Sequence, residues 1–346
     1  MRRLISDVLG RAGMEVVAEA ANGREAIDAC RKHSPDILSL DLAMPELDGI
    51  EVLKQLRPQT QSRNGRGGPQ LRIVVVSSFS ERDGVRAVDA LSEGAFELVP
   101  KRAAGGKLQD FLDDLLSKLE AAVVESKTAP RRAIAPAPTV TSEQPAERRR
   151  VPRSIADAKG ARRLVLIASS TGGPRALTTV ARQLPADLGQ GLLIVQHMPA
   201  GFTHSLASRL DTYARLSICE ATGGEKISAD AGYIAPGGQH MRIRRKRIEL
   251  SNEPPVGGLR PCADITIEDA VREFGANIVL AVLTGMGRDA LAGARKVHEA
   301  GGVVIAEHAD TTTVNGMPKA VVDAGIADGI LPIEEIGVAI TEAAGG

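Results

Sequence analysis

The sequence predicts an α/β protein with two doubly wound parallel sheets joined by a linker. Short apolar runs alternate with stretches of helical periodicity, which is the pattern of βαβ units. The chain has 346 residues, more than one ordinary core accommodates. Only 2% of the residues are aromatic, so the cores consist of aliphatic side chains, as buried parallel strands prefer.

The first half of the chain alternates strictly. We expect strands at residues 16–18, 37–40, 73–76 and 96–99. Apolar residues at helical spacing predict helices at residues 4–9, 24–33, 50–57, 85–93 and 108–119. Two of these strands end at Asp41 and Ser77, and a third ends near Lys101. This βαβα alternation argues for a doubly wound parallel sheet.

Residues 121–161 interrupt the alternation. They are rich in Pro, Ala and Arg, which predicts a linker that is stiff where prolines cluster. The first domain then covers residues 1–120 and the second residues 162–346. In the second, we expect strands at residues 164–168, 192–195, 233–234, 278–283 and 303–306, a hairpin within 241–250, and a helix from Asp289.

Three strand ends of the second domain supply a hydroxyl, an imidazole and a carboxylate. Ser170, His197 and Asp289 each follow an apolar strand within a few residues. A serine becomes a nucleophile when an imidazole takes its proton, and a carboxylate orients that imidazole. The combination favours a serine hydrolase. The glycine-rich turns beside Ser170 and before Asp289 supply N–H groups for an oxyanion.

Each of these residues has a simpler interpretation when taken alone. Ser170 is typical of a helix N-cap, His197 of a satisfied polar residue and Asp289 of an acid in the first turn of a helix. The segment S-T-G-G-P is also compatible with a phosphate or nucleotide cradle, although it lacks the G-x-G-x-x-G spacing. Only the coincidence of all three at strand ends favours catalysis.

Composition excludes several other classes. Lys+Arg and Asp+Glu number 43 each, so no overall positive field attracts nucleic acid. No apolar stretch is long enough for membrane insertion, and the first residues do not resemble a signal peptide. The 3 cysteines are far apart, which argues against disulfides or a zinc site. We therefore expect a cytoplasmic protein.

Five motifs in the second domain resemble those of the chemotaxis protein-glutamate methylesterases (the CheB family), and they occur in that family's order. They are I-A-S-S-T-G-G-P, Q-H-M-P-A-G-F-T, Y-I-A-P-G-G-Q-H-M, L-T-G-M-G-R-D and N-G-M-P-K-A. The resemblance implies hydrolysis of glutamate γ-methyl esters on methyl-accepting chemotaxis receptors, with release of methanol, and deamidation of receptor glutamines. It implies that Ser170 is the nucleophile, His197 the base and Asp289 the orienting acid, with Met286 as an oxyanion donor and Thr171 as a neighbour. Hydrolysis itself needs no cofactor.

The first domain resembles the receiver domains of response regulators, which have a flavodoxin-like fold. The segment L-S-L-D-L-A-M-P-E-L-D-G matches the phosphoacceptor loop, which makes Asp41 the phosphorylation site, Ser77 the switch hydroxyl and Lys101 the associated lysine. The resemblance implies a histidine kinase of the chemotaxis type as partner and Mg²⁺ as the ion for phosphoryl transfer. The family's first strand, with the acidic pair that holds Mg²⁺, has no match here. We therefore expect an incomplete receiver and a working protein that begins upstream of Met1.

Two further points concern the function. Leu259 stands where the methylesterase family usually has a histidine, which affects receptor preference or rate. The alternative to a regulated hydrolase is a catalytically inactive regulator that binds receptors or kinase. Retention of Ser170, His197 and Asp289 together favours the hydrolase.

Overall fold

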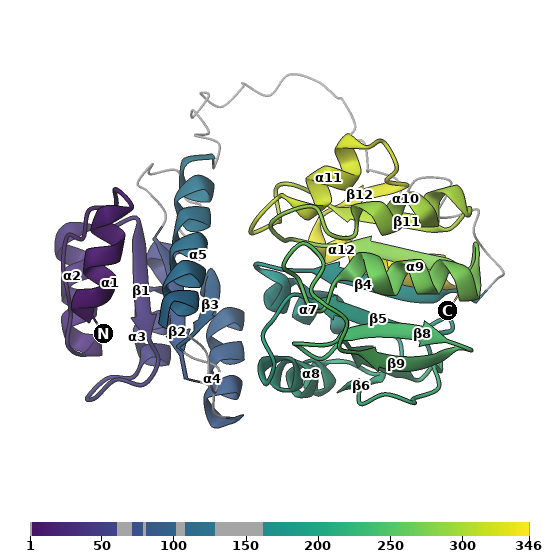
Figure 1. Ribbon diagram of the computed structural model, residues 1–346, viewed down its shortest axis with the longest axis horizontal. Coiled ribbons are helices and arrows are strands. Elements are labelled where there is room, and N and C mark those ends of the chain that lie inside the picture. Colours follow the sequence, from purple (N-terminus) through teal and green to yellow (C-terminus); the bar gives the residue numbers. More distant parts are fainter. Residues whose placement is uncertain (1, 61–70, 79–80, 102–107, 129–161, 346) are drawn as a thin grey trace, which may run out of the picture. The chain divides into compact units, whose positions relative to one another are not determined.

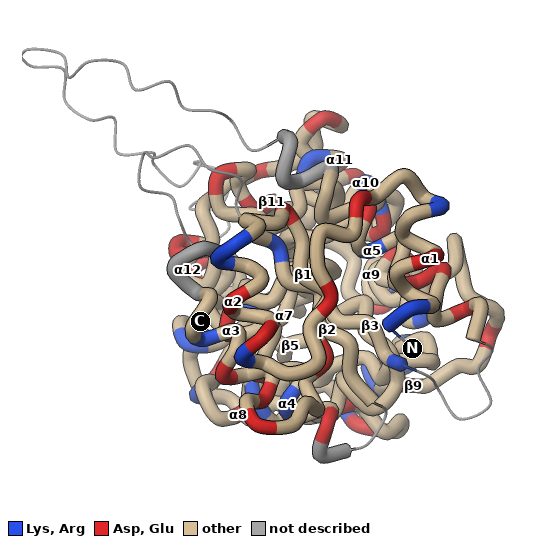
Figure 2. Tube along the Cα trace, turned by 90° about the vertical axis from the view of Figure 1, so that its left-hand side faces the viewer, with Lys and Arg blue, Asp and Glu red and all other residues tan. Residues whose placement is uncertain are grey.

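The computed structural model describes residues 2–60, 71–78, 81–101, 108–128 and 162–345. The chain divides into two compact units, Met1–Arg149 and Arg150–Gly346, and each is built on its own parallel sheet (Figure 1). The predicted α/β class with two parallel sheets is confirmed. Lys, Arg, Asp and Glu are interspersed along both units (Figure 2), in keeping with the balanced composition.

The first unit has a sheet of three strands in its described part, in the order β1-β2-β3. These strands are β1 (Ile37–Asp41), β2 (Arg72–Ser77) and β3 (Glu97–Pro100). The apolar residues of the central strand β2 are buried on both faces, as parallel strands covered by helices require. The helices α3 and α4 pack against β2, α5 packs against all three strands, α1 packs on α5 and α2 on α3. They are α1 (Arg2–Arg11), α2 (Gly23–His33), α3 (Gly49–Thr60), α4 (Glu81–Ser92) and α5 (Leu108–Thr128).

The strand expected at residues 16–18 is absent, so that prediction is wrong. Residues 14–20 form neither helix nor strand, and Val16 and Val17 are 38% and 42% exposed. A strand needs a hydrogen-bonded neighbour, and in the described residues β1 ends the sheet with no strand beside it.

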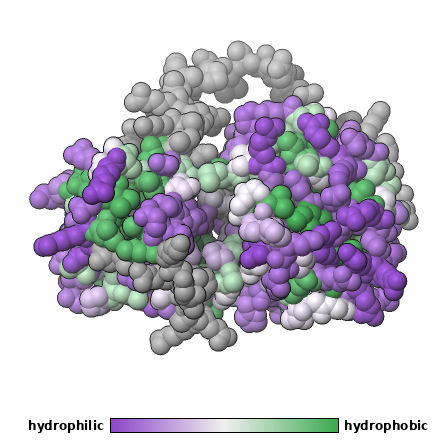
Figure 3. Space-filling view, viewed as in Figure 1, coloured by the Kyte–Doolittle hydropathy of each residue, from purple (hydrophilic) through white to green (hydrophobic). Residues whose placement is uncertain are grey.

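An apolar area is visible on the surface of this unit (Figure 3).

The last helix of the first unit is longer than expected. We expected a helix over residues 108–119 and a linker from residue 121, but α5 continues to Thr128. The extra residues begin with Ala121, Ala122 and Val123, and Ala122 is fully buried. They extend the apolar helical stripe, so the helix continues because its buried face does. Residues 129–161 of the expected linker lie outside the described residues.

The second unit has a sheet of seven parallel strands in the order β12-β11-β10-β4-β5-β7-β6. They are β4 (Leu164–Ser169), β5 (Gly191–Gln196), β6 (Ser217–Glu220), β7 (Ala231–Ile234), β10 (Ile278–Val282), β11 (Val303–Glu307) and β12 (Gly329–Leu331). A separate antiparallel hairpin consists of β8 (His240–Arg244) and β9 (Arg247–Ser251), as expected from the sequence. Every residue of β4, β5, β10 and β11 is buried.

Helices cover both faces of this sheet. One group contains α7 (Gly173–Ala181), α8 (Phe202–Tyr213) and α12 (Ile333–Ala344), in which α7 packs against the other two. The other group contains α9 (Ala263–Phe274), α10 (Leu291–Glu299) and α11 (Met317–Asp323), in which α10 packs against both neighbours. The hairpin packs on α9 (Figure 1). Two covered faces explain the continuous apolar strands.

The strand order reverses beside β4. From β4 the chain continues to β5 on one side, and later returns to place β10 on the other side. In open parallel sheets, ligands bind beyond the carboxyl ends of the strands at such a switch point. The crevice therefore belongs to the segments that follow β4, β5 and β10. In the described parts of the chain, no helix is long and apolar enough to cross a membrane.

Candidate active site

A buried pair joins two of the predicted strand-end residues. His197 follows β5, and Asp289 lies in the segment between β10 and α10. Nε2 of His197 is 2.7 Å from Oδ2 of Asp289, and the two side chains are only 8% and 4% exposed. The neutral imidazole therefore carries its proton on Nε2 and donates it to the carboxylate. Nδ1 of His197 is buried, and none of the described residues forms a hydrogen bond with it. This leaves Nδ1 able to accept a proton.

Ser170 lies next to His197 because of strand register. β4 and β5 pair in parallel with Ser169 opposite Gln196, so the next residues, Ser170 and His197, are side by side. The amide of Gln196 donates to the carbonyls of both Ser170 and His197, at 2.9 and 3.0 Å. Strand pairing and the backbone contacts of Gln196 thus place Ser170 beside the pair of His197 and Asp289. No hydrogen bond joins its hydroxyl to His197, which is common before substrate binds.

The two adjacent serines have different surroundings. Ser169 is fully buried, and its hydroxyl donates to Oε1 of Gln196 at 2.7 Å. Ser170 is partly exposed at the turn that leads into α7. Successive residues of a strand point to opposite faces, so only one of the two serines can face the crevice. The side chain of Ser169 lies in the interior, so Ser170 is the serine that can face the crevice.

Asp289 is held by backbone donors as well as by His197. The N–H groups of Ala263 and Asp264, at the start of α9, donate to its two oxygens at 2.6 and 3.0 Å. The N–H of Ala290 adds a third bond at 2.9 Å. The first turn of a helix has free N–H groups and a positive dipole end, so it stabilises a buried carboxylate. Asp289 is therefore fixed from two sides.

These contacts decide the charge of Asp289. Burial alone raises the pKa of its carboxyl, but the hydrogen bond and charge of His197 and the N–H donors outweigh burial, so the pKa of Asp289 lies well below its usual range. Burial raises the pKa of the Cys262 thiol to about 12, and the Asp289 charge adds to this. The protonated thiol of Cys262 donates to Oδ1 of Asp289 at 3.3 Å. The acid stays ionised and Cys262 stays neutral.

The histidine of the hairpin supports the same carboxylate indirectly. His240 is fully buried; its Nδ1 accepts from the N–H of Cys262 and its Nε2 donates to the carbonyl of Pro254, both at 3.2 Å. This pattern fixes one neutral tautomer. His240 thereby orients the segment whose next two N–H groups bind Asp289.

Thr284 connects the loops on either side of Ser170. Its carbonyl accepts from the N–H of Ser170 at 3.0 Å, and its hydroxyl donates to the carbonyl of Thr171 at 2.9 Å. The same hydroxyl accepts from the N–H groups of Thr313 and Val314. All the polar groups of this buried residue are thus used to hold neighbouring segments together.

The contact between these loops requires glycine. A Cβ atom on Gly285 would lie 2.7 Å from Cβ of Ser170, which is closer than carbon atoms approach. Gly172 has a φ of 81°, and a side chain there would also overlap Thr313. The glycines of the S-T-G-G and T-G-M-G motifs therefore permit the close approach of the segments after β4 and β10.

The predicted oxyanion donor Met286 and the predicted neighbour Thr171 belong to the two loops that meet at Ser170. Thr171 is buried at the turn into α7. Met286 is 45% exposed at the outer part of the loop after β10. With respect to the part of the chain that the structure describes, the Met286 N–H makes no hydrogen bond, so it is available to an oxyanion.

Sequence reasoning missed a buried acid at the end of β11. Glu307 is 1% exposed; its Oε2 accepts from the N–H of Thr284 at 2.8 Å, and its Oε1 lies 3.0 Å from the hydroxyl of Thr311. Burial raises the pKa of Glu307 to about 7, and the charge of Glu334 contributes. Near neutral pH this carboxyl takes up or loses a proton while it binds the loop that holds Ser170.

Sequence reasoning also missed Gln196, Thr284, Cys262 and His240 as supporting residues. One signal was available for Gln196, Thr284 and His240, because these three are polar residues at strand ends or in quoted motifs. Buried polar groups need partners, so a polar residue in a fully buried position indicates a hydrogen-bond network. The sequence does not show which partner each one has.

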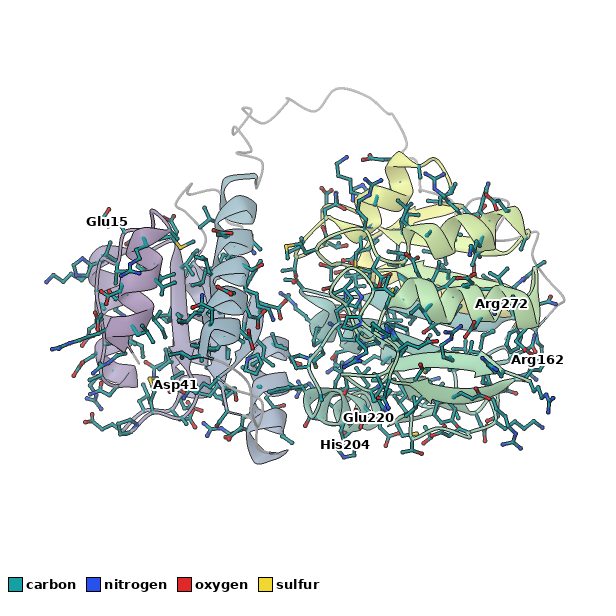
Figure 4. All side chains as sticks on the ribbon, viewed as in Figure 1. Glu15, Asp41, Arg162, His204, Glu220 and Arg272 are labelled. Carbon is teal, nitrogen blue, oxygen red and sulfur yellow. The ribbon has the colours of Figure 1, made fainter. Side chains whose placement is uncertain are left out.

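In the first unit, Asp41 and Lys101 are brought together. Asp41 ends β1 and is labelled in Figure 4. Its Oδ2 is 2.5 Å from Nζ of Lys101, and its Oδ1 accepts from the N–H of Ala43 at 3.0 Å. Ser77 is buried at the end of β2, but its hydroxyl faces the carbonyls of Ser78 and Asp83 rather than Asp41.

The surroundings of Asp41 do not fit the expected Mg²⁺ site. Both of its oxygens already have partners, and the nearby Asp48 forms an ion pair with Arg86 at 3.0 Å. Across the described ranges, no three His, Cys, Asp or Glu side chains gather in a way that would hold a metal ion. Hard cations such as Mg²⁺ need several oxygen ligands, so we assign no step to this ion.

A serine beside a buried His–Asp pair, at the switch point of a parallel sheet, has the residue types and the location that suit a serine hydrolase. Comparison with known proteins gives the family. Residues 165–340 match the family described as CheB methylesterase, and residues 1–113 match the response regulator receiver domain. The chain therefore belongs to the CheB methylesterase family and has a receiver domain before the catalytic one.

Individual relatives agree with this assignment. The chain is 36% identical over 348 residues to protein-glutamate methylesterase/protein-glutamine glutaminase 1 of Syntrophomonas wolfei, covering 97% of this chain and 94% of that protein. It is 37% identical over 354 residues to a protein of the same name from Symbiobacterium thermophilum, covering 100% and 94%. The crystal structure of the Thermotoga maritima CheB methylesterase catalytic domain is 39% identical, with a TM-score of 0.51, and covers 53% of this chain and 99% of that one.

Asp289→Asn should lower kcat by roughly 10⁴ without abolishing folding, because an amide in place of the carboxylate favours the wrong tautomer of His197. Both carboxylate oxygens also face backbone N–H groups, so the new NH₂ group opposes a donor in either orientation. The measurement is methanol release from a γ-methylglutamyl peptide, with thermal unfolding as a check. Asp211→Asn is the control, because its carboxylate accepts from the N–H of Ile218, at β6, rather than from groups around His197. A loss below about tenfold in Asp289→Asn would contradict an orienting role.

Glu307→Gln should remove a pH dependence of stability. The folded-state pKa of Glu307, about 7, lies above its unfolded value, so the folded chain keeps a proton that the unfolded chain releases. Stability therefore falls as pH rises through 7, whereas glutamine mimics the protonated form at every pH. The free energy of unfolding of the variant, minus that of the unmutated chain, should grow by about 2–3 kcal/mol between pH 5 and 8. Denaturant unfolding measures it, with the exposed Glu299→Gln as control. A constant difference would mean that Glu307 stays ionised throughout.

Proposed function

We propose that this chain hydrolyses glutamate γ-methyl esters on methyl-accepting chemotaxis receptors and deamidates specific receptor glutamines, under control of its receiver domain. The observation that carries this is the buried pair of His197 and Asp289 beside Ser170, with Nδ1 of the histidine unpartnered. Membership of the methylesterase family and the names of the relatives agree with it.

Ser170 acts as the nucleophile and His197 as the base. The Ser170 hydroxyl adds to the ester carbonyl carbon while its proton passes to Nδ1 of His197, and the ionised Asp289 stabilises the imidazolium. The intermediate collapses when the bond from carbon to the methoxy oxygen breaks. His197 returns the proton to that oxygen, methanol leaves, and an acyl-serine remains. With a glutamine substrate the leaving group is ammonia.

Water completes the reaction. His197 removes a proton from a water molecule, which adds to the acyl carbon, and the bond to Ser170 breaks to give the glutamate carboxylate. The oxyanion of both steps is stabilised by N–H groups on either side of Ser170, of which that of Met286 is the best candidate. Each such donor contributes about 10²–10³ in kcat in comparable hydrolases.

Control of the activity comes from the first unit. We assign Asp41 as the residue that a chemotaxis-type histidine kinase phosphorylates. The support is its position at the end of β1, where the ammonium of Lys101 binds its Oδ2. A phosphoryl group at Asp41 would disrupt this contact and supply new acceptors for Lys101. Such a control system belongs in the cytoplasm, in agreement with the cysteine usage.

Ser170→Ala should abolish ester hydrolysis, with a loss of roughly 10⁶ in kcat by analogy with other serine triads. Ser169→Ala is the matched control and should retain most activity, although it leaves Oε1 of Gln196 without its donor at a cost of about 1 kcal/mol. Methanol release from methylated receptor measures both. Comparable rates in Ser170→Ala and the unmutated chain would refute the assignment. The opposite ranking of the two variants would move the nucleophile to Ser169.

A shortened chain that begins at Arg162 should be active and should exceed the full chain in kcat/KM on methylated receptor. The catalytic unit has its own sheet and core, so removal of the receiver leaves its packing intact. We propose that the unphosphorylated receiver restricts access of the receptor to Ser170. Steady-state kinetics of both forms test this. A slower shortened chain would show that the receiver instead helps to position the substrate.

A further inference from the structure

A groove of about 340 Å³ lies between α10 and α11, beside the loop that precedes Asp289. Its charged lining consists of Arg288 from that loop, Arg295 from α10, and Lys319 and Asp323 from α11. The other lining residues are glycine and alanine, so residues that fill little space lie among the charged ones around the groove. We call it the α10–α11 groove.

The groove has an excess of positive charge. Arg288 and Arg295 are exposed, and neither forms a salt bridge with any residue that the structure describes. Lys319 pairs with Asp323 at 2.5 Å, one turn away on the same helix, and both side chains are about 60% exposed. Three cations thus face a single acid, within a chain whose charges balance overall. Charges of one sign gathered in a hollow favour ligands of the opposite sign.

The backbone of Gly316 and Gly285 lies between the groove and Ser170. Gly316 lines the groove, and the N–H groups of Gly316 and Met317 both donate to the carbonyl of Gly285, at 3.0 and 2.9 Å. A Cβ on Gly285 would in turn overlap Ser170. The groove is therefore close enough to Ser170 for residues that flank a bound glutamyl group to reach Arg288 and the groove.

We propose that the α10–α11 groove binds free carboxylates of the substrate polypeptide that flank the glutamyl group undergoing hydrolysis. This rests on the proposed function, and it adds a preference for acidic sequence around the ester. On a helical substrate, residues three and four positions away from the ester lie about 5–6 Å from it on the same face. Arginine recognises carboxylates in a bidentate manner, so Arg295 and Arg288 suit this role better than lysines alone.

The test compares three synthetic peptides that carry one γ-methylglutamyl residue. Glu, Gln or Lys occupies the positions three and four residues on either side. The full unmutated chain should process the Glu peptide with a kcat/KM at least about fivefold above that of the Gln peptide at low salt, and the difference should shrink at about 1 M salt. The Lys peptide should be the poorest.

Reversal of charge in the groove provides the decisive variant. The double variant Arg295→Glu with Lys319→Glu should lose the preference for the Glu peptide and favour the Lys peptide over it. This reversed preference cannot result from misfolding, which lowers all three rates together. Arg215→Glu is the control, because Arg215 is exposed and precedes β6, at the other edge of the sheet from β12. Its order of preference should match that of the unmutated chain.

Four outcomes would overturn the inference, and they are distinguishable. Equal kcat/KM on all three peptides, with methanol released from each, would leave the proposed function intact and refute the groove as a binding site. A double variant that still prefers the Glu peptide would show that carboxylates are recognised elsewhere. No methanol from any peptide or from methylated receptor would refute the proposed function together with the inference. A double variant that is faster on all three peptides would identify an acidic surface other than substrate, such as the receiver, as the occupant.

Discussion

Removal of a carboxylate from water is costly unless donors replace the water, and the catalytic unit is organised around one such carboxylate. Asp289 accepts from three backbone N–H groups, from the Cys262 thiol and from His197. Two of those N–H groups belong to the first turn of α9, whose position the hairpin histidine His240 fixes. The result is a permanent negative charge beside the imidazole of His197. Because the donors are backbone groups in packed elements, the charge requires no reorganisation when the imidazole takes up a proton.

Ser170, the proposed nucleophile, depends on a second set of contacts, which shares only His197 with the first. Gln196 sets the register between Ser170 and His197, and Thr284 joins the turn after β4 to the loop after β10. Glu307 binds the Thr284 N–H from the next strand. Each of these residues is at the end of a buried strand, where backbone positions are set by the sheet. The active site is thus assembled from neighbouring strand ends rather than from one loop, which limits how far any single segment can move.

Much of this could be predicted from the sequence, and the limits have a physical cause. Ser170, His197 and Asp289 were predictable because a polar residue after an apolar strand has a definite place at the sheet edge. The support from Gln196, Glu307 and Cys262 was not, because their partners come from other strands and depend on register. The strand expected at residues 16–18 failed for a related reason: an apolar pattern predicts a strand only where a neighbouring strand can pair with it. The end of α5 was predicted too early. The sequence becomes rich in alanine near residue 121, but the buried apolar face of the helix continues beyond that point.

The arrangement of the site also separates chemistry from recognition. The segments after β4, β5 and β10 are held by buried hydrogen bonds and by glycines that admit no side chain, so substitutions there disturb the backbone around Ser170. The α10–α11 side is different: Arg295 and Lys319 are exposed, and their side chains hold no other segment in place. Residues on that face can change without cost to the positions of Ser170 and His197. Under the proposed function, a change of charge on this face would therefore alter substrate preference without moving Ser170. The hydrogen bonds that the N–H groups of Gly316 and Met317 donate to the carbonyl of Gly285 keep that face in a fixed position relative to Ser170.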